Sequence, residues 1–289
     1  MDLLQYSNEL MTFSFPAWSE MAKALKSLPR DEGPSCISSK KYYRQQIEKQ
    51  ANLFPGFAVK FTAFLGWLDS QGLKELPNSI AHGAKAQLYL QPMCGPAQPG
   101  GIFTFETFDA TDPKWTMLLP FRVQDPIPFQ EEETVVFHEF GHFVFQGLLG
   151  RVLPKPISEE DDINLYLPIV EGFADWVSYE FLGKWVCADP TRQILNTSTE
   201  ERHQVISGKH EYLGFDLHQT SAAFRDVLID LSAKEGPGSS VAAMNRILRN
   251  LVAEGYEPGQ KISGRSAMIN RAVGDAFLPL PGADQNSRK

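Results

Sequence analysis

The segment from Glu131 to Gly150 is apolar on nearly every side of a helix, yet it contains two histidines and a further glutamate. An apolar pattern on all sides is typical of a helix that is buried in the centre of a domain. Three glutamates at its start suit the positive end of the helix dipole, and Gly150 predicts an end after Leu149. We therefore expect one buried helix around which the rest of the domain folds.

The polar residues inside this helix are His138, Glu139 and His142, in the order His-Glu-Phe-Gly-His. Positions four apart share a helix face, so both imidazoles can point at one metal ion while Glu139 lies beside it. Burying these groups is costly without compensation, and a metal ion provides that compensation. The alternative is a pair of hydrogen-bonded core histidines. The spacing favours a zinc site in which Glu139 acts as general base on a water molecule.

A catalytic zinc site needs a third protein ligand and keeps one position open for water. The best candidate is Glu171, which follows His142 after enough chain for a loop and a return helix, with Pro168 suited to the first helical position. Asp175 lies four residues later on the same helix face. There it can accept a hydrogen bond from the free nitrogen of a ligating histidine, which we expect to be His138. The alternative is a carboxylate pair on a helix surface.

The set His138, Glu139, His142, Glu171 and Asp175 resembles the gluzincin group of metallopeptidases, of which thermolysin is the familiar member. The resemblance implies a peptidase that uses Zn²⁺ as cofactor and a peptide or protein as substrate. It also implies that His138, His142 and Glu171 are the zinc ligands and that Glu139 is the catalytic base.

A further resemblance lies in residues 216–231, which contain His218 and, three positions later, Ser221. In thermolysin-like enzymes a histidine and a serine with this spacing open a helix. In that family the histidine stabilises the oxyanion of the reaction intermediate, and the resemblance gives this role to His218. The chain has Ala222 where the family usually has a glycine after the serine. Three other side chains therefore remain candidates for stabilising the oxyanion: Tyr166, Tyr212 and His210.

Two other functions remain open at this stage. The cytoplasmic ImmA/IrrE-like regulatory proteases also follow the histidine motif with a glutamate and a nearby alanine plus aspartate, and Ala174 with Asp175 fits them. A metal-binding interaction protein without hydrolytic activity is the other, although the intact Glu139 argues against it. The chain lacks the Gly-x-Met-Glu-Asn motif of gluzincin aminopeptidases, which makes an exopeptidase of that kind less expected.

The pattern predicts an α+β chain with a zincin-like arrangement, in which a mixed lobe with a small sheet over the motif helix precedes a mainly helical lobe. Residues 1–80 are expected to be a helical region of unknown role, residues 81–150 to hold the sheet and the motif helix, and residues 151–289 to form the helical lobe with the third ligand. Other helices are expected at 18–28, 40–54, 57–69, 168–185, 199–207, 221–233, 239–253 and 264–277, and strands at 86–91, 102–108 and 115–123. An edge strand could bind an extended peptide by strand addition.

The composition of the chain excludes some classes of binding partner. The net charge of −8 argues against nucleic acid and against anionic membrane surfaces. No apolar run is long enough for a transmembrane segment, and the first residues do not resemble a signal peptide. A cytoplasmic protein is expected from the chain as written, or a secreted one if a leader was removed. The oligomeric state stays open.

Two further features give weaker indications of ligands. The acidic run 159–162 could hold Ca²⁺, as thermolysin-like enzymes do, although a solvated loop explains it better because the spacing is not that of an EF-hand. The 3 cysteines are widely separated, which favours free thiols over a zinc knuckle.

Overall fold

The computed structural model describes residues 3–27, 39–75, 86–93, 116–122, 133–153, 168–184, 197–211, 217–256 and 265–277. Within these residues the chain is α+β, with one four-stranded sheet and a predominance of helix, which confirms the expected class. None of the helices described is long and apolar enough to cross a membrane.

The sheet contains β1 (Leu3–Ser7), β2 (Met11–Pro16), β3 (Ala86–Met93) and β4 (Thr116–Arg122), in that spatial order. β1 and β2 form an antiparallel hairpin, whereas β2, β3 and β4 run parallel to one another. The side chain of Asn8 shapes the hairpin turn, because its Oδ1 accepts hydrogen bonds from the backbone N–H of Leu10 and Met11 at 2.9 Å each.

The hairpin corrects the expectation of a helical region over residues 1–80 at residues 3–16, whereas the helices predicted within that region are present. The alternation of side chains favours a strand over a helix at these residues, because Met11, Phe13 and Phe15 are fully buried on one face of β2. Since β2 pairs with β3, the sheet also joins the residues before position 80 to those after it. The strands predicted at 86–91 and 115–123 are present as β3 and β4, and the one predicted at 102–108 lies outside the described residues.

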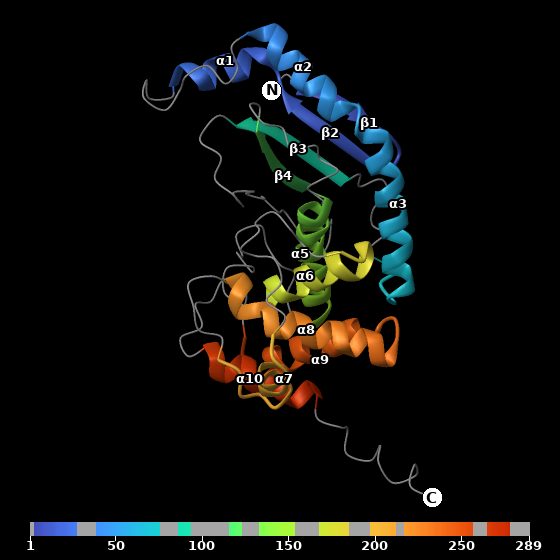
Figure 1. Ribbon diagram of the computed structural model, residues 1–289, viewed down its shortest axis with the longest axis vertical. Helices are drawn as coiled ribbons and strands as arrows, with labels where there is room; N and C mark the ends of the chain where they lie inside the picture. Colours follow the sequence, from blue (N-terminus) through green and yellow to red (C-terminus); the bar gives the residue numbers. More distant parts are fainter. Residues whose placement is uncertain are drawn as a thin grey trace, which may run out of the picture.

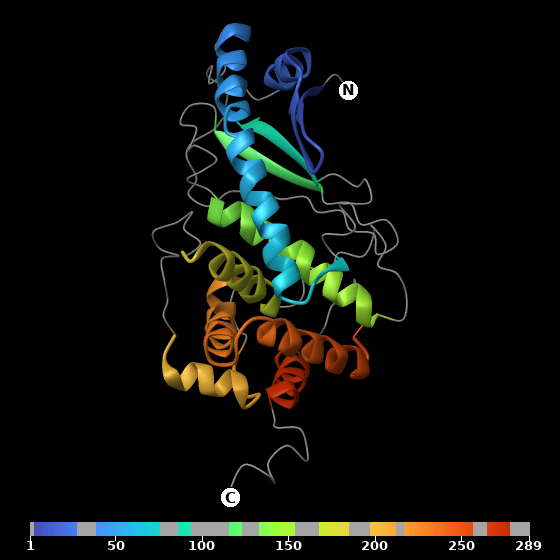
Figure 2. The same cartoon turned by 90° about the vertical axis from the view of Figure 1, so that its right-hand side faces the viewer.

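Three helices follow the hairpin: α1 (Trp18–Ser27), α2 (Lys40–Ala51) and α3 (Phe54–Ser70). α3 extends from the sheet towards the other end of the molecule (Figure 1, Figure 2). Aromatic rings connect α3 to the sheet and to the helix that carries the histidine motif. The ring of Phe57 in α3 lies 5.7 Å from that of Phe13 in β2 and 5.6 Å from that of Phe137, measured between ring centroids. The core is therefore continuous from the sheet to the centre of the molecule.

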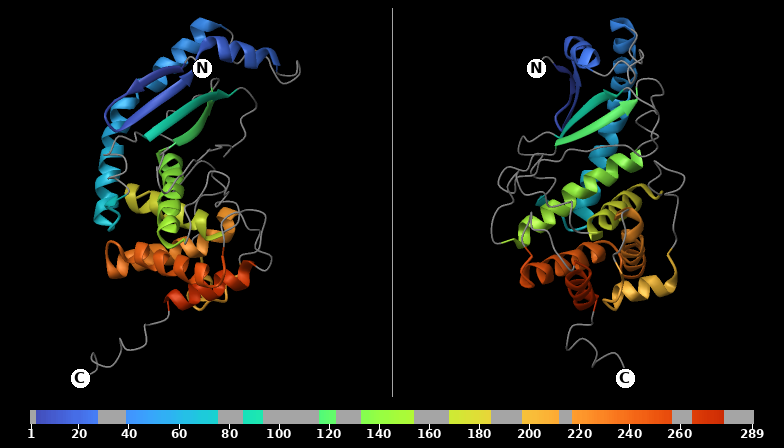
Figure 3. Two further views of the ribbon diagram at one scale, coloured as in Figure 1. Left: turned by 180° about the vertical axis from the view of Figure 1, so that it is seen from behind. Right: turned by 90° about the vertical axis from the view of Figure 1, so that its left-hand side faces the viewer.

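The central helix is α5 (Glu133–Val152), and α6 (Pro168–Leu182) packs against it. α5 continues through Gly150 to Val152, three residues beyond the end predicted after Leu149. A glycine costs a helix only about 1 kcal/mol, and the hydrogen bond from the backbone N–H of Leu153 to the carbonyl of Leu149 is still made at 3.1 Å. α5 lies between the sheet on one side and the helices from residue 199 onwards on the other (Figure 1, Figure 3).

The helices after α6 are α7 (Thr199–Ile206), α8 (Leu217–Glu235), α9 (Ser239–Ala253) and α10 (Arg265–Phe277). α8 packs against α6, and α9 packs against α5 and α10. A capping box begins α7, in which Ser198 and Glu201 satisfy each other's backbone N–H groups. This mainly helical part agrees with the helices predicted for residues 151–289.

Candidate metal centre

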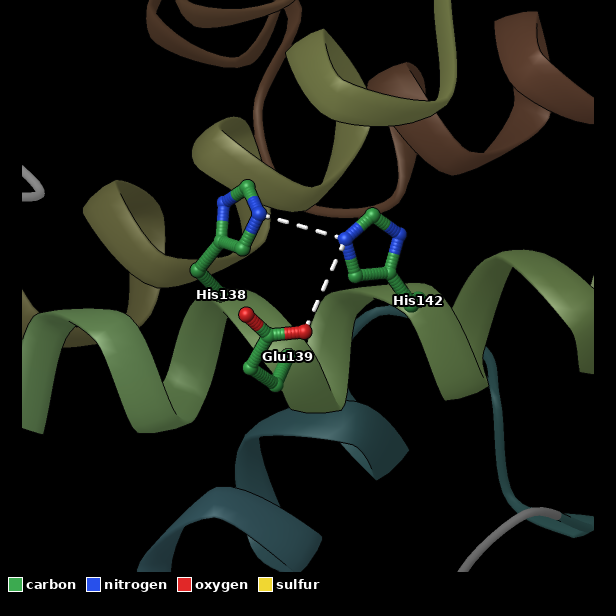
Figure 4. Close-up of side chains that lie close together, drawn as sticks. All are labelled: His138, Glu139 and His142. Carbon is green, nitrogen blue, oxygen red and sulfur yellow. Dashed lines mark hydrogen bonds and ion pairs between the residues drawn. The ribbon is translucent and has the colours of Figure 1, made fainter. Parts of the chain in front are cut away.

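Three side chains of the motif gather on the middle of α5 (Figure 4). His138, Glu139 and His142 are buried, with 3%, 7% and 5% of their surface exposed. Each offers one nitrogen or oxygen atom that could bind a metal ion, and these atoms all lie within 4.8 Å of one another. The two imidazoles lie on the same side of the helix, as the spacing of four residues requires.

α6 adds two carboxylates to this group. Oε2 of Glu171 lies 3.2 Å from Nε2 of His138 and 3.6 Å from Nε2 of His142. Oδ1 of Asp175 lies 2.7 Å from Nδ1 of His138, on the far side of the ring. The structure thus brings together the five residues that the sequence pattern singled out.

The separations among three of these atoms fit one tetrahedral ion. A tetrahedral zinc with bonds of about 2.0 to 2.2 Å holds neighbouring ligand atoms about 3.3 to 3.6 Å apart. Nε2 of His138 and Nε2 of His142 are 3.2 Å apart, and Oε2 of Glu171 is 3.2 and 3.6 Å from them. His138, His142 and Glu171 can therefore hold such an ion with little movement.

Electrostatics point the same way. Asp175 can only accept a hydrogen bond when ionised, so it holds the proton of His138 on Nδ1 and leaves a lone pair on Nε2. In that tautomer the lone pair faces a carboxylate oxygen of Glu171, which is also an acceptor, and lies 3.2 Å from Nε2 of His142. Acceptors that converge in a buried place repel one another unless a proton or a metal cation lies between them.

The two histidines differ in their affinity for a proton. Burial alone would lower the pKa of His138, but Asp175, Glu171 and Glu139 raise it well above its usual value. Burial lowers the pKa of His142 to about 4, although Glu171 opposes this effect. The cluster thus favours one positive charge at the point where its acceptors meet.

Three contacts hold the first turn of α5, and the sequence pattern did not predict them. Glu133 is buried and forms ion pairs with Lys60 of α3 and with Lys184, whose Nζ lies 3.3 Å from Glu133 Oε2. Ser178 of α6 donates a hydrogen bond of 2.7 Å to the carbonyl of Thr134. The one available signal was the lone Lys60 in an otherwise apolar run, which indicates a buried acidic partner without naming it.

The residues expected to stabilise an oxyanion are not brought to this site by any described contact. His218 is in the first turn of α8, but the described side chains of that helix begin at Ser221. His210 is buried beyond the end of α7, and its carbonyl accepts a hydrogen bond of 2.7 Å from Asn270 of α10. Tyr166, Tyr212 and the acidic run 159–162 lie outside the described residues. These roles stay predictions.

Comparison with known proteins adds no relative: no family model, no curated protein and no solved structure matches this chain. The interpretation of the site therefore depends on the five residues and their geometry.

Proposed function

We propose that this protein is a zinc-dependent peptidase. The observation that supports it best is the convergence of three metal-binding atoms from α5 and α6, with the carboxylate of Glu139 beside them. Three protein ligands leave a fourth position for water, which is the arrangement of catalytic zinc sites rather than of structural ones.

His138, His142 and Glu171 would hold the ion. A zinc ion bound there would supply a Lewis acid that acidifies water and polarises the carbonyl of a peptide bond. Asp175 keeps His138 in the tautomer that presents Nε2 to the ion, through the contact of 2.7 Å at Nδ1.

Glu139 is the group for proton transfer. Its Oε2 lies 3.8 Å from Nε2 of His142, farther away than the three ligand atoms lie from one another. That offset suits a base that reaches a water molecule next to the ion rather than the ion itself. Glu139 would accept a proton from the attacking water and deliver it to the leaving amine, and His218 is our candidate for stabilising the oxyanion.

In a zincin-like arrangement, the peptide substrate would bind along the edge strand of the sheet. β4 is at one end of the described sheet and is the strand drawn nearest to α5 (Figure 1, Figure 2). An extended peptide added to this strand would run past the metal site, with its backbone held by hydrogen bonds of the sheet type.

The direct test replaces Glu139 with glutamine and measures hydrolysis of an unstructured protein such as casein, with and without a chelator. Wild-type protein should digest casein, and the chelator should stop it. Glu139→Gln should retain zinc and lose about 10²- to 10⁴-fold in rate, because the base is gone while the ligands remain. The matched control is Glu254→Gln at the end of α9, which should keep full activity.

The outcomes separate the alternatives. Unchanged turnover in Glu139→Gln would end the proposal. A wild-type protein that binds zinc but leaves casein intact would favour either a regulatory protease with one protein substrate or an interaction protein without hydrolytic activity.

A further inference from the structure

A glycine inside the motif marks the point where α5 and α6 are in contact through their backbones. A Cβ atom at Gly141 would lie 2.6 Å from Cα, 3.0 Å from the carbonyl oxygen and 3.1 Å from Cβ of Ala174. Ala174 is fully buried, so it has no room to move outwards. No side chain larger than hydrogen fits at Gly141 unless the two helices separate.

A second glycine marks the other side of α6. A Cβ atom at Gly172 would lie 2.6 Å from the carbonyl oxygen of Ser221 and 3.2 Å from the backbone nitrogen of Arg225, both in α8. α6 is therefore held between α5 and α8 by two contacts in which backbone meets backbone.

The positions of these contacts coincide with the metal centre. Gly141 lies between His138 and His142 in the motif, and its partner Ala174 is next to Asp175. Gly172 follows Glu171 directly. The close approach of the helices thus occurs within one helical turn of every proposed ligand.

Not every glycine in the described helices has such a contact. A Cβ atom at Gly66 of α3 would meet nothing within 4 Å. Gly66 is a helical glycine without a packing requirement, and it offers a matched position for the same substitution.

We propose that Gly141 and Gly172 are positioning residues that fix α6 between α5 and α8. They thereby set the place of Glu171 relative to the histidines of α5, and with it the metal affinity of the site. This inference depends on the proposed zinc site. Relieving a contact of 2.6 Å needs an outward shift of about 1 Å, since carbon atoms pack at about 3.5 to 4.0 Å. A shift of that size would carry Glu171 out of reach of an ion that His138 and His142 hold, because zinc bonds span only about 2.0 to 2.2 Å.

The test compares Gly141→Ala and Gly172→Ala with Gly66→Ala and wild type. Zinc affinity is measured by competition with a chelating indicator, and the visible spectrum of the Co²⁺-loaded protein reports how many ligands the ion has. Gly141→Ala and Gly172→Ala should bind zinc about 10- to 100-fold more weakly, the range seen when the supports of metal ligands are lost. Their cobalt bands should also weaken as tetrahedral coordination is lost, whereas Gly66→Ala should match wild type in both.

Ala174→Ser keeps the inference testable if Gly141→Ala does not fold, because it adds one heavy atom to the other side of the same contact. It should weaken zinc binding and change the cobalt spectrum in the same direction. Wild-type zinc affinity and an unchanged cobalt spectrum in the folded variants would overturn the positioning role while leaving the zinc site intact. A wild-type protein that binds no zinc would overturn the proposed function, and this inference with it.

Discussion

α5 and α9 pack against each other, yet they bury their side chains in opposite ways. α9 buries one face, with Met244, Ile247 and Leu248 at helical spacing, and leaves Arg246 and Arg249 exposed. α5 is buried on all sides from Glu133 to Leu149, and the ionisable side chains within this stretch are buried too. α9 follows the ordinary rule for a helix at the edge of a core.

The difference shows what a buried ionisable side chain requires. Several of these residues have a partner from outside α5: Glu133 has Lys60 and Lys184, His138 has Asp175 and Glu171, and His142 has Glu171. α9 has no need of such partners because its charges reach solvent. An all-buried helix that carries charge is costly to build, and a metal centre gives a reason for it.

The largest expected effect concerns packing around α5. Phe140 is fully buried, and its ring lies 5.0 Å from that of Phe61 and 5.7 Å from that of Phe64. Phe140→Ala should lower the free energy of unfolding by about 3 to 5 kcal/mol, because it leaves a cavity among rigid rings. Arg249→Ala on the exposed face of α9 should change it by no more than about 0.5 kcal/mol. Equal effects in denaturant titrations would show that the two helices do not differ.

A smaller effect is expected from the carboxylate behind His138. Asp175→Asn keeps the shape of the side chain but removes its charge, so zinc affinity should fall about 10- to 100-fold, or about 1.4 to 2.7 kcal/mol. Ser178→Ala is the control, because Ser178 joins α6 to α5 at Thr134 without touching the histidines. If competition titrations show the same loss in both variants, general loosening of α6 explains the result and the specific role of Asp175 is wrong.

The smallest effect concerns the ion pairs of Glu133. Lys60 and Lys184 are about half exposed, so they can turn to solvent when their partner is neutralised, and only the buried end loses its contacts. Glu133→Gln should therefore cost about 1 to 2 kcal/mol of stability in metal-free protein. Glu254→Gln, which removes a surface partner of Arg271, should leave the melting temperature unchanged. A melting temperature of Glu133→Gln equal to that of wild type would mean that burial of Glu133 contributes nothing.

Local pattern predicted the helices well, because period and capping are encoded within a few residues. α9 begins and ends at the predicted residues, Ser239 and Ala253. The site residues on α5 and α6 were also visible, since two histidines four apart and a glutamate with an aspartate four later are spacings within single helices.

The rest depends on pairing between distant residues, which local pattern does not contain. The alternation of Met11, Phe13 and Phe15 was available as a strand signal, but its pairing with β3 joins residues more than seventy positions apart in sequence. The closeness of Gly141 to Ala174 and the ion pair of Lys60 with Glu133 are likewise products of tertiary packing.

The central claim is that α5 and α6 together bind one zinc ion, and anomalous diffraction at the zinc edge from crystals of the zinc-loaded protein tests it most directly. We expect one strong peak, about 2.0 to 2.2 Å from Nε2 of His138, Nε2 of His142 and an oxygen of Glu171, with Glu139 beside it but not bound. Glu171→Ala should lose this peak. The absence of a peak in the wild-type protein would contradict the account. So would a peak that persists in Glu171→Ala, together with a wild-type structure in which Glu171 points away from both imidazoles.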